Sequence, residues 1–224
     1  MADLAREQEA TLARPRMAYG LQARLLFWGM DLLYGRPLTL RKAQVLEILA
    51  RIPYQSWEMR QYLKLTRQRD DADSVRLARR ITAWARAAQD NEFWHLLVLD
   101  ERLRRTGAGR CWFRDRLVPR VAAWKYRLYC RLLSLVSMRA AFQLNAEFED
   151  HAEHEYMQFV RDHPELDQEP VDSPVVCEQG DFRTWGDVFR RIGLDEREHM
   201  NNSLEFCGLP AVPGAAAGTA AAPV

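Results

Sequence analysis

The chain has 224 residues, 48% hydrophobic and 28% charged, with a formal net charge of +1 at pH 7. This length allows one hydrophobic core of ordinary size, and the near-neutral charge provides no field that would attract nucleic acid, so no nucleic-acid partner is expected. The four cysteines form no Cys-x-x-Cys pair, which argues against a zinc knuckle and a disulfide framework. No run of 18 apolar residues exists, so no single helix is expected to span a bilayer.

The two ends of the chain differ in composition from the rest. Residues 1–16 carry several acidic side chains and no apolar segment, so we expect a flexible N-terminus and no secretory signal. Residues 209–224 consist mainly of alanine, proline and glycine, and we expect this tail to be disordered. The functional domain is therefore predicted over residues 17–208.

Two helices are predicted in the first third of this domain. The pattern over 17–34 is apolar around much of the helix circumference. A second helix begins near Leu38, and in it Glu47 is an acidic residue on an otherwise apolar stripe. Pro53 is expected to kink this second helix because proline removes one hydrogen bond and crowds the preceding turn.

The next helix is predicted over 74–105. Glu92 and His95 stand three residues apart, so they occupy one face of this helix, in line with large apolar residues. A buried ionised carboxylate is costly unless it is paired or bound to a metal. The pair is therefore a candidate for metal binding.

A long helical pattern over 114–161 has two different halves. The first half mixes large apolar side chains with arginines, which fits either an interior helix with arginines at its rim or a helix lying in a membrane interface. We favour the second interpretation, because one core cannot easily bury both this helix and the apolar helix at 17–34. The second half is polar except for one stripe that contains Glu149 and, two turns later, Tyr156.

The last helix is predicted to open at Thr184-x-x-Asp187, which resembles a capping box, and to close at Gly208. It repeats the earlier spacing, because Glu196 and His199 again stand three residues apart on the apolar face.

Two Glu-x-x-His pairs and two further inward glutamates, on four different helices, are the pattern of a ferritin-like di-iron carboxylate bundle. The sequence therefore predicts an all-α four-helix bundle with additional amphipathic helices at a membrane interface. The alternative is that the pairs are ordinary i,i+3 pairs on surface helices. The candidate metal ligands are Glu47, Glu92, His95, Glu149, Glu196 and His199.

Other ionisable residues are not expected to bind metal. His151, His154 and His163 have no glutamate three residues before them, and they are expected to face solvent or to support the ligands from outside. The same expectation covers a set of glutamates on the helices that carry the ligands. This set is Glu147, Glu153, Glu155 and Glu198.

Four stretches of the chain resemble motifs of the alternative oxidase family, most closely its plastid terminal oxidase branch. They are VLEILARIPY around Glu47, NEFWHLLVLDERL around Glu92, FEDHAEHEYMQF around Glu149, and DEREHM around Glu196. The resemblance covers about residues 30 to 207. It implies a membrane-bound, non-haem di-iron quinol oxidase that uses two iron ions, reduces dioxygen to water and pumps no protons.

The resemblance also implies roles for single residues. The four glutamates would hold the iron pair, with His95 and His199 close to the metals. Tyr156 matches a tyrosine with a redox role, and Asp195 and Asn91 match positions that support the metal ligands. Quinol would bind near Lys42, Leu46 and Ala152. Lys42 departs from the family, which has arginine there, and lysine offers a point charge rather than a planar fork.

The expected partners are quinol, dioxygen and the surface of a lipid bilayer, and a homodimer is left open. The expected location is a monotopic attachment to a bacterial inner membrane, facing the cytoplasm, with an organellar membrane as the alternative. A soluble ferritin-like iron-binding protein or a soluble di-iron hydroxylase is the alternative function. The side chains expected to face lipid are Leu25, Phe27, Trp28, Leu117, Val121, Trp124, Leu128, Leu132 and Leu135.

Overall fold

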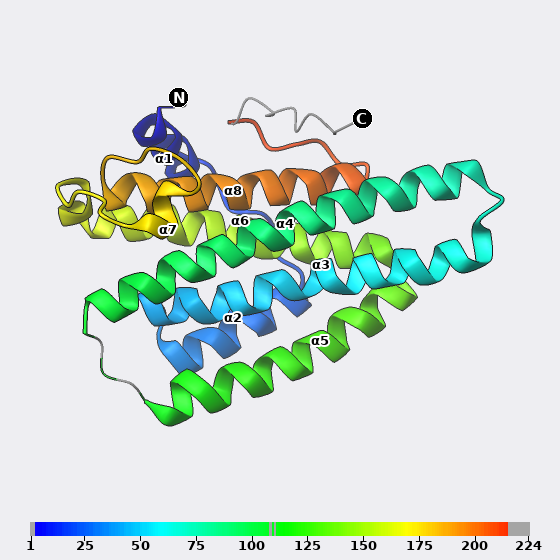
Figure 1. Ribbon diagram of the computed structural model, residues 1–224, viewed down its shortest axis with the longest axis horizontal. Coiled ribbons are helices and arrows are strands. Elements are labelled where there is room, and N and C mark those ends of the chain that lie inside the picture. The colour runs from blue at the N-terminus through cyan, green and yellow to red at the C-terminus, as the bar shows by residue number, and fades with distance from the viewer. Residues whose placement is uncertain (1–2, 108, 110, 215–224) are drawn as a thin grey trace. The chain divides into compact units, whose positions relative to one another are not determined.

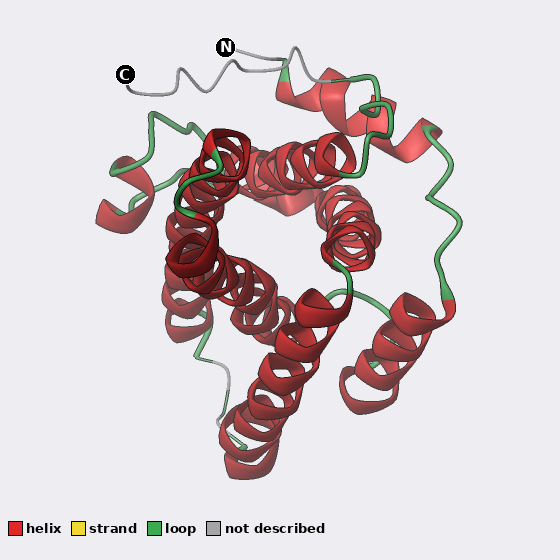
Figure 2. Ribbon diagram, turned by 90° about the vertical axis from the view of Figure 1, so that its right-hand side faces the viewer, coloured by secondary structure: helices red, strands yellow, loops and turns green. Residues whose placement is uncertain are grey.

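The computed structural model describes residues 3–107, 109 and 111–214. Within these residues every regular element is helical, as Figure 2 shows, and the prediction of an all-α protein is confirmed. The elements in chain order are α1 (Leu4–Ala13), α2 (Leu21–Tyr34), α3 (Leu40–Gln68), α4 (Ala72–Arg105), a π-helical turn (Phe113–Leu117), α5 (Val118–Val136), α6 (Met138–Asp162), a 3-10 turn (Pro164–Asp167), α7 (Pro174–Cys177) and α8 (Trp185–Phe206).

The described chain divides into two compact units. The first unit contains the residues up to Ala23 and those from Asn145 onward, and the second unit contains Arg24–Leu144. The boundaries fall inside α2 and α6, so each of these helices contributes residues to both units.

The second unit is built on the long hairpin of α3 and α4, with α5 packed along α3 (Figure 1). Thr39 and Asp71 cap the N-termini of α3 and α4, respectively, with side-chain oxygens, and α3 continues through Pro53. The core of the hairpin contains stacked aromatic rings, because the Trp57 and Trp84 ring centroids lie 5.2 Å apart. Such ring pairs stabilise a core beyond their buried area.

The first unit packs α8 against α1 and against α6. Gly193 permits close approach of α8 to α6, because a Cβ atom there would lie 3.0 Å from Cε of Met157. A side chain at this position would require the end of the Met157 side chain to move. Thr184 begins α8 by accepting a hydrogen bond from the backbone N–H of Asp187, as the predicted cap requires.

The long pattern over 114–161 forms two helices rather than one. Ser137 separates α5 from α6 with extended backbone dihedral angles, φ −152° and ψ 111°, and its Oγ accepts a hydrogen bond from the N–H of Ala140 at 3.2 Å. Serine favours this arrangement at a helix N-terminus, because its side chain replaces a missing backbone acceptor. Uninterrupted apolar periodicity on both sides of Ser137 concealed the break.

Both ends of the chain contain structure that the sequence did not predict. Residues 1–16 were expected to be flexible, yet α1 forms there and buries Gln8 and Thr11. Of the predicted disordered tail, 215–224 lie outside the described residues, and Val212 exchanges backbone–side-chain hydrogen bonds with Asn201.

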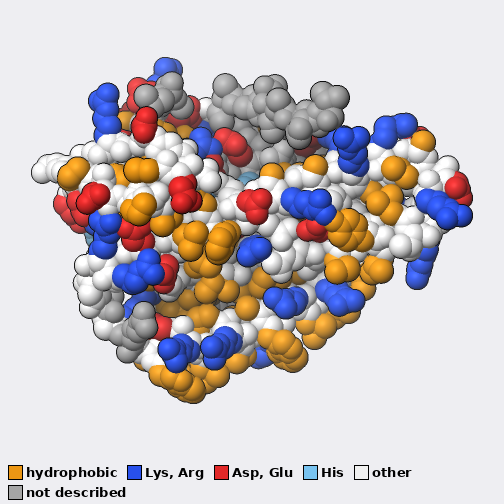
Figure 3. Space-filling view, in the orientation of Figure 1, with side chains coloured by type: hydrophobic (Ala, Val, Ile, Leu, Met, Phe, Trp, Pro, Cys, Tyr) orange, Lys and Arg blue, Asp and Glu red, His pale blue; other side chains and the backbone are white. Residues whose placement is uncertain are grey.

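The outward faces of α2 and α5 in the second unit expose large apolar side chains. Trp28 is 64% exposed and Trp124 is 67% exposed, and Figure 3 shows apolar side chains interleaved with basic ones along α5, at the lower edge of the view. Phe27 was expected to face lipid. This prediction is wrong, because only 7% of the surface of Phe27 is exposed. No described helix is both long and apolar enough to cross a membrane.

Candidate metal centre

Three predicted ligands come together within the second unit. Glu47 lies on α3, and Glu92 and His95 lie one turn apart on α4. Nδ1 of His95 is 3.3 Å from Oε2 of Glu47 and 3.5 Å from Oε2 of Glu92. All three side chains are buried, so the hairpin of α3 and α4 presents two carboxylates and one imidazole to the same point.

The first unit contains a second group of the same composition. Glu149 lies on α6, and Glu196 and His199 lie one turn apart on α8. Nδ1 of His199 is 3.6 Å from Oε2 of Glu196, and all three residues are buried. The spacing that put each glutamate and histidine on one helix face was therefore read correctly from the sequence.

Each group fits a metal ion by its donor atoms. In each group, every residue offers one oxygen or nitrogen donor, and these donors lie within 4.8 Å of one another. A metal ion that bonds each donor at roughly 2.1 Å holds its ligand atoms about 3 to 4 Å apart, and the histidine–glutamate separations of 3.3, 3.5 and 3.6 Å lie in this range. Carboxylate oxygen and imidazole nitrogen are also a donor set that iron accepts in proteins.

Two residues outside the predicted set fix the position of Glu149. Nδ2 of Asn145 donates to Oε1 of Glu149 at 3.0 Å and to Oγ of Ser203 at 3.1 Å, and both interactions are buried. Asn145 precedes Glu149 by one helical turn. Helical spacing of four residues places Asn145 on the face of Glu149 and Ser203 on the face of His199, but no local pattern indicates that the two side chains meet.

A buried ion-pair network lies beside the group in the first unit. Glu153 was expected to be solvated or to support the ligands from outside; it is fully buried and accepts hydrogen bonds from Arg14, Thr11 and Arg197, at 2.6 to 2.8 Å. Asp150 accepts further bonds from Arg14, Tyr19 and the N–H of Met17. The distances for Asp150 are 2.6 Å, 2.7 Å and 2.9 Å, respectively.

This network accounts for a third cluster of potential ligands, Asp150, Glu153 and His154. The two carboxylates already face the guanidinium of Arg14, and Nδ1 of His154 lies 2.7 Å from the carbonyl oxygen of Asp150. Positive charge from the protein neutralises these carboxylates, so the cluster is an ion-pair network rather than a metal site.

Tyr156 and Asp195 are both buried in the first unit. Tyr156 follows Glu149 by two turns of α6, and its ring stacks on Phe189 with centroids 6.4 Å apart. Asp195 pairs with Arg191, one turn earlier on α8. Burial lowers the pKa of Arg191, but the charge of Asp195 and their hydrogen bond outweigh it, so that this pKa is raised.

The residues predicted near quinol are buried as well. Lys42 and Leu46 lie one turn apart on α3, and Ala152 lies on α6. Nζ of Lys42 donates to Oδ1 of Asp31 at 2.7 Å, to the carbonyl oxygen of Arg36 at 2.8 Å and to that of Gly35 at 3.0 Å. These three acceptors match the three hydrogens of the ammonium group, so Lys42 fixes the connection between α2 and α3.

The fold and the two groups define an all-helical protein with buried carboxylate and histidine side chains that could hold a metal ion. Comparison with models of known protein families and with curated proteins finds no match for this chain.

Proposed function

We propose that the chain is a membrane-bound, non-haem di-iron quinol oxidase of the alternative oxidase type. The observation that carries this proposal is the repeated group of two glutamates and one histidine, Glu47, Glu92 and His95 in one unit and Glu149, Glu196 and His199 in the other. Four carboxylates and two imidazoles are the ligand set of a di-iron carboxylate centre. The resemblance of four sequence stretches to alternative oxidases supports the same assignment.

In this proposal the six side chains together hold two iron ions. Iron in such a site supplies the electron-transfer chemistry that reduces dioxygen. The protein supplies anionic oxygen donors, which stabilise the ferric state, and a buried setting from which water is excluded. Asn145 holds the Glu149 carboxylate in place through its 3.0 Å hydrogen bond.

Tyr156 is proposed to donate an electron and a proton during the reduction of dioxygen. It is buried and lies on the helix that carries Glu149. The phenolic hydrogen is the group that this role requires. Quinol is proposed to bind near Leu46 and Ala152, with Lys42 supporting the adjacent turn rather than offering a spare hydrogen to the substrate.

Attachment to a membrane surface is supported by the exposed apolar faces of α2 and α5. Each inserted methylene contributes about 0.8 kcal/mol, so several such side chains can hold a protein at a bilayer without a spanning helix. The basic side chains along α5 would then lie among lipid headgroups. A soluble ferritin-like protein has no need of these faces.

Oxygen uptake by membranes from cells that express the chain tests this function. We expect uptake that depends on added quinol, requires iron and persists in cyanide, because the centre contains no haem. Membranes that contain the Glu92→Ala protein are the matched control. Uptake that is equal in both preparations, or absent from the wild-type membranes although the protein is present there and loaded with iron, would reject the oxidase assignment.

A further inference from the structure

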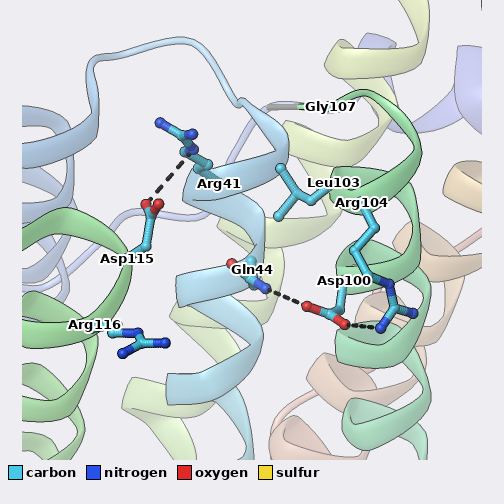
Figure 4. A pocket seen from close by; sticks show the side chains of 8 residues that line it. All are labelled: Arg41, Gln44, Asp100, Leu103, Arg104, Gly107, Asp115 and Arg116. Atoms are coloured by element: carbon cyan, nitrogen blue, oxygen red, sulfur yellow. Dashed lines mark hydrogen bonds and ion pairs between the residues drawn. The ribbon is translucent and has the colours of Figure 1, made fainter. Parts of the chain in front are cut away.

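A pocket of about 400 Å³ opens at one end of the second unit, where α3 begins, α4 ends and the π-helical turn leads into α5. Figure 4 shows Arg41 and Arg116 on one side of this pocket, and the pair of Asp100 and Arg104 on the other. Neither metal-binding group contributes to it.

The pocket has an excess of positive charge, with three arginines against two aspartates. Asp100 is engaged on the α4 side, because it accepts from Nη1 of Arg104 at 2.9 Å and from Nε2 of Gln44 at 3.4 Å. Asp115 is used mainly by its own turn, where Oδ2 accepts from the backbone N–H of Cys111 at 2.6 Å.

Arg41 and Arg116 are therefore the two side chains with unused binding capacity. Nε of Arg41 forms an ion pair with Oδ1 of Asp115 at 3.7 Å, a distance beyond hydrogen bonding, so the N–H donors of Arg41 stay available (Figure 4). The Arg41 side chain donates no hydrogen bond to another described residue, and the Arg116 side chain has neither a hydrogen bond nor an ion pair with any residue in the described part of the chain.

Two guanidinium groups that face one cavity are suited to a phosphate group. Each guanidinium presents parallel N–H donors that match two phosphate oxygens, and charged hydrogen bonds of this kind are about twice as strong as neutral ones. The N-terminus of α3, which begins at Leu40, adds the positive end of a long helix dipole to the same pocket.

The surroundings of the pocket indicate which phosphate compound it takes. Trp112 and Phe113, at the start of the π-helical turn, are 66% and 54% exposed, and Leu117 begins the exposed apolar stripe of α5. Exposed aromatic side chains next to arginines are typical of the level of lipid headgroups. A lipid whose phosphate lies in the pocket would have its acyl chains beside this stripe.

We propose that the pocket binds the phosphate of an anionic phospholipid headgroup, with Arg41 and Arg116 as its principal contacts. Binding of a lipid there rests on the proposed attachment of α2 and α5 to a bilayer. The site gives the protein a preference for anionic membranes that apolar insertion alone does not provide.

Co-sedimentation of the full chain with vesicles tests this site. We expect phosphatidylcholine vesicles that contain a minor fraction of phosphatidylglycerol to bind the protein roughly tenfold more tightly than pure phosphatidylcholine vesicles. Arg41→Gln combined with Arg116→Gln should remove this gain. The control, Arg120→Gln combined with Arg127→Gln, removes two exposed charges from α5 outside the pocket and should retain most of the gain.

If the two double variants lose the phosphatidylglycerol-dependent gain in binding equally, the proposed site is wrong, because non-specific charge attraction would then explain the preference for anionic vesicles. Inorganic phosphate is the second probe: if it binds as tightly as the phosphatidylglycerol vesicles do, the lipid assignment is wrong. Binding to pure phosphatidylcholine and iron content report separately on the proposed function. If both are intact while phosphatidylglycerol gives no gain in binding, the proposed lipid site is wrong and the proposed function stands. If the protein holds no iron but shows a gain that needs Arg41 and Arg116, the lipid site stands and the proposed function is wrong.

Discussion

Arg197 on α8 and Glu153 on α6 form a buried ion pair, in which Nε of Arg197 donates to Oε1 of Glu153 at 2.8 Å. Arg197 also donates to Thr11 and to Glu7, both on α1. Burial lowers the pKa of Arg197, but the charges and hydrogen bonds of Glu153 and Glu7 raise it more, so the guanidinium stays charged. The pair therefore joins three helices of the first unit.

Replacing Arg197 with Gln should lower the free energy of unfolding by about 3–5 kcal/mol, because Glu153 would keep a buried charge without its partner. Urea denaturation followed by circular dichroism measures this loss. The control is Arg161→Gln, at an exposed position. A loss of equal size in both variants would show that the buried pair contributes nothing beyond an ordinary surface arginine.

Glu149→Ala should prevent iron binding in the first unit while the helices still form. The variant removes one of the three donors of this group. Without iron, the variant no longer buries an uncompensated carboxylate, so the thermal midpoint of the iron-free variant should equal or exceed that of the iron-free wild type. Iron assay and thermal unfolding, with and without added iron, measure both effects. Iron should stabilise Glu149→Ala less than it stabilises the wild type and the exposed control Glu178→Ala. Undiminished iron binding in Glu149→Ala would remove Glu149 from the ligand set.

Tyr156→Phe should retain the iron and lose most quinol oxidation, because only the phenolic hydroxyl is removed and the ring can still stack on Phe189. We expect a fall of about a hundredfold or more, the range for loss of a positioned proton donor. Tyr62→Phe, which removes a half-exposed hydroxyl that donates to Glu58, is the control. Wild-type turnover in Tyr156→Phe would make Tyr156 a packing residue only.

The cysteines should differ in their reaction with a thiol reagent. Burial raises the pKa of the Cys130 thiol to about 12, so this side chain should stay protonated and unreactive in the folded protein. Hydrogen bonding from the backbone of Arg114 lowers the pKa of Cys111, which increases its thiolate fraction below the ordinary thiol pKa. Mass mapping after brief labelling should find Cys111 modified before Cys130. The reverse order would contradict both assigned environments, and denatured protein, in which the two should react alike, is the control.

Replacing Leu128, Leu132 and Leu135 with Gln should release the protein from membranes, because these exposed side chains of α5 would no longer insert. High salt should not release the wild type, whereas detergent should. A matched control replaces three other exposed leucines, Leu63, Leu77 and Leu209, with Gln. Fractionation of cell extracts measures the distribution, and release of the unmodified protein by salt alone would contradict apolar attachment.

The sequence predicted which glutamates and histidines are buried together in each group, because helical periodicity is a local property. Glu92 with His95, and Glu196 with His199, share a helix face at a spacing of three residues, and apolar neighbours mark that face as inward. Glu47 and Glu149 were found in the same way, as acidic residues on apolar stripes.

The parts that escaped prediction depend on contacts between residues far apart in the chain. Helix α1 is short and polar, and Gln8 and Thr11 hold it against α6 and α8 through hydrogen bonds with Met157 and Arg197. Glu153 is buried only because Arg14 and Arg197 reach it. No local pattern contains such partners, since tertiary packing overrides the preference of a polar segment for solvent.

Mössbauer spectroscopy of the protein loaded with enriched iron, together with an iron assay, tests the di-iron assignment most directly. Six ligands from the two groups should hold two ferric ions per chain whose spins are coupled to a diamagnetic ground state. The Glu47→Ala and Glu196→Ala variants should each lose that coupled signal. One iron per chain, or two magnetically independent irons, would contradict the proposal that the two groups hold an iron pair.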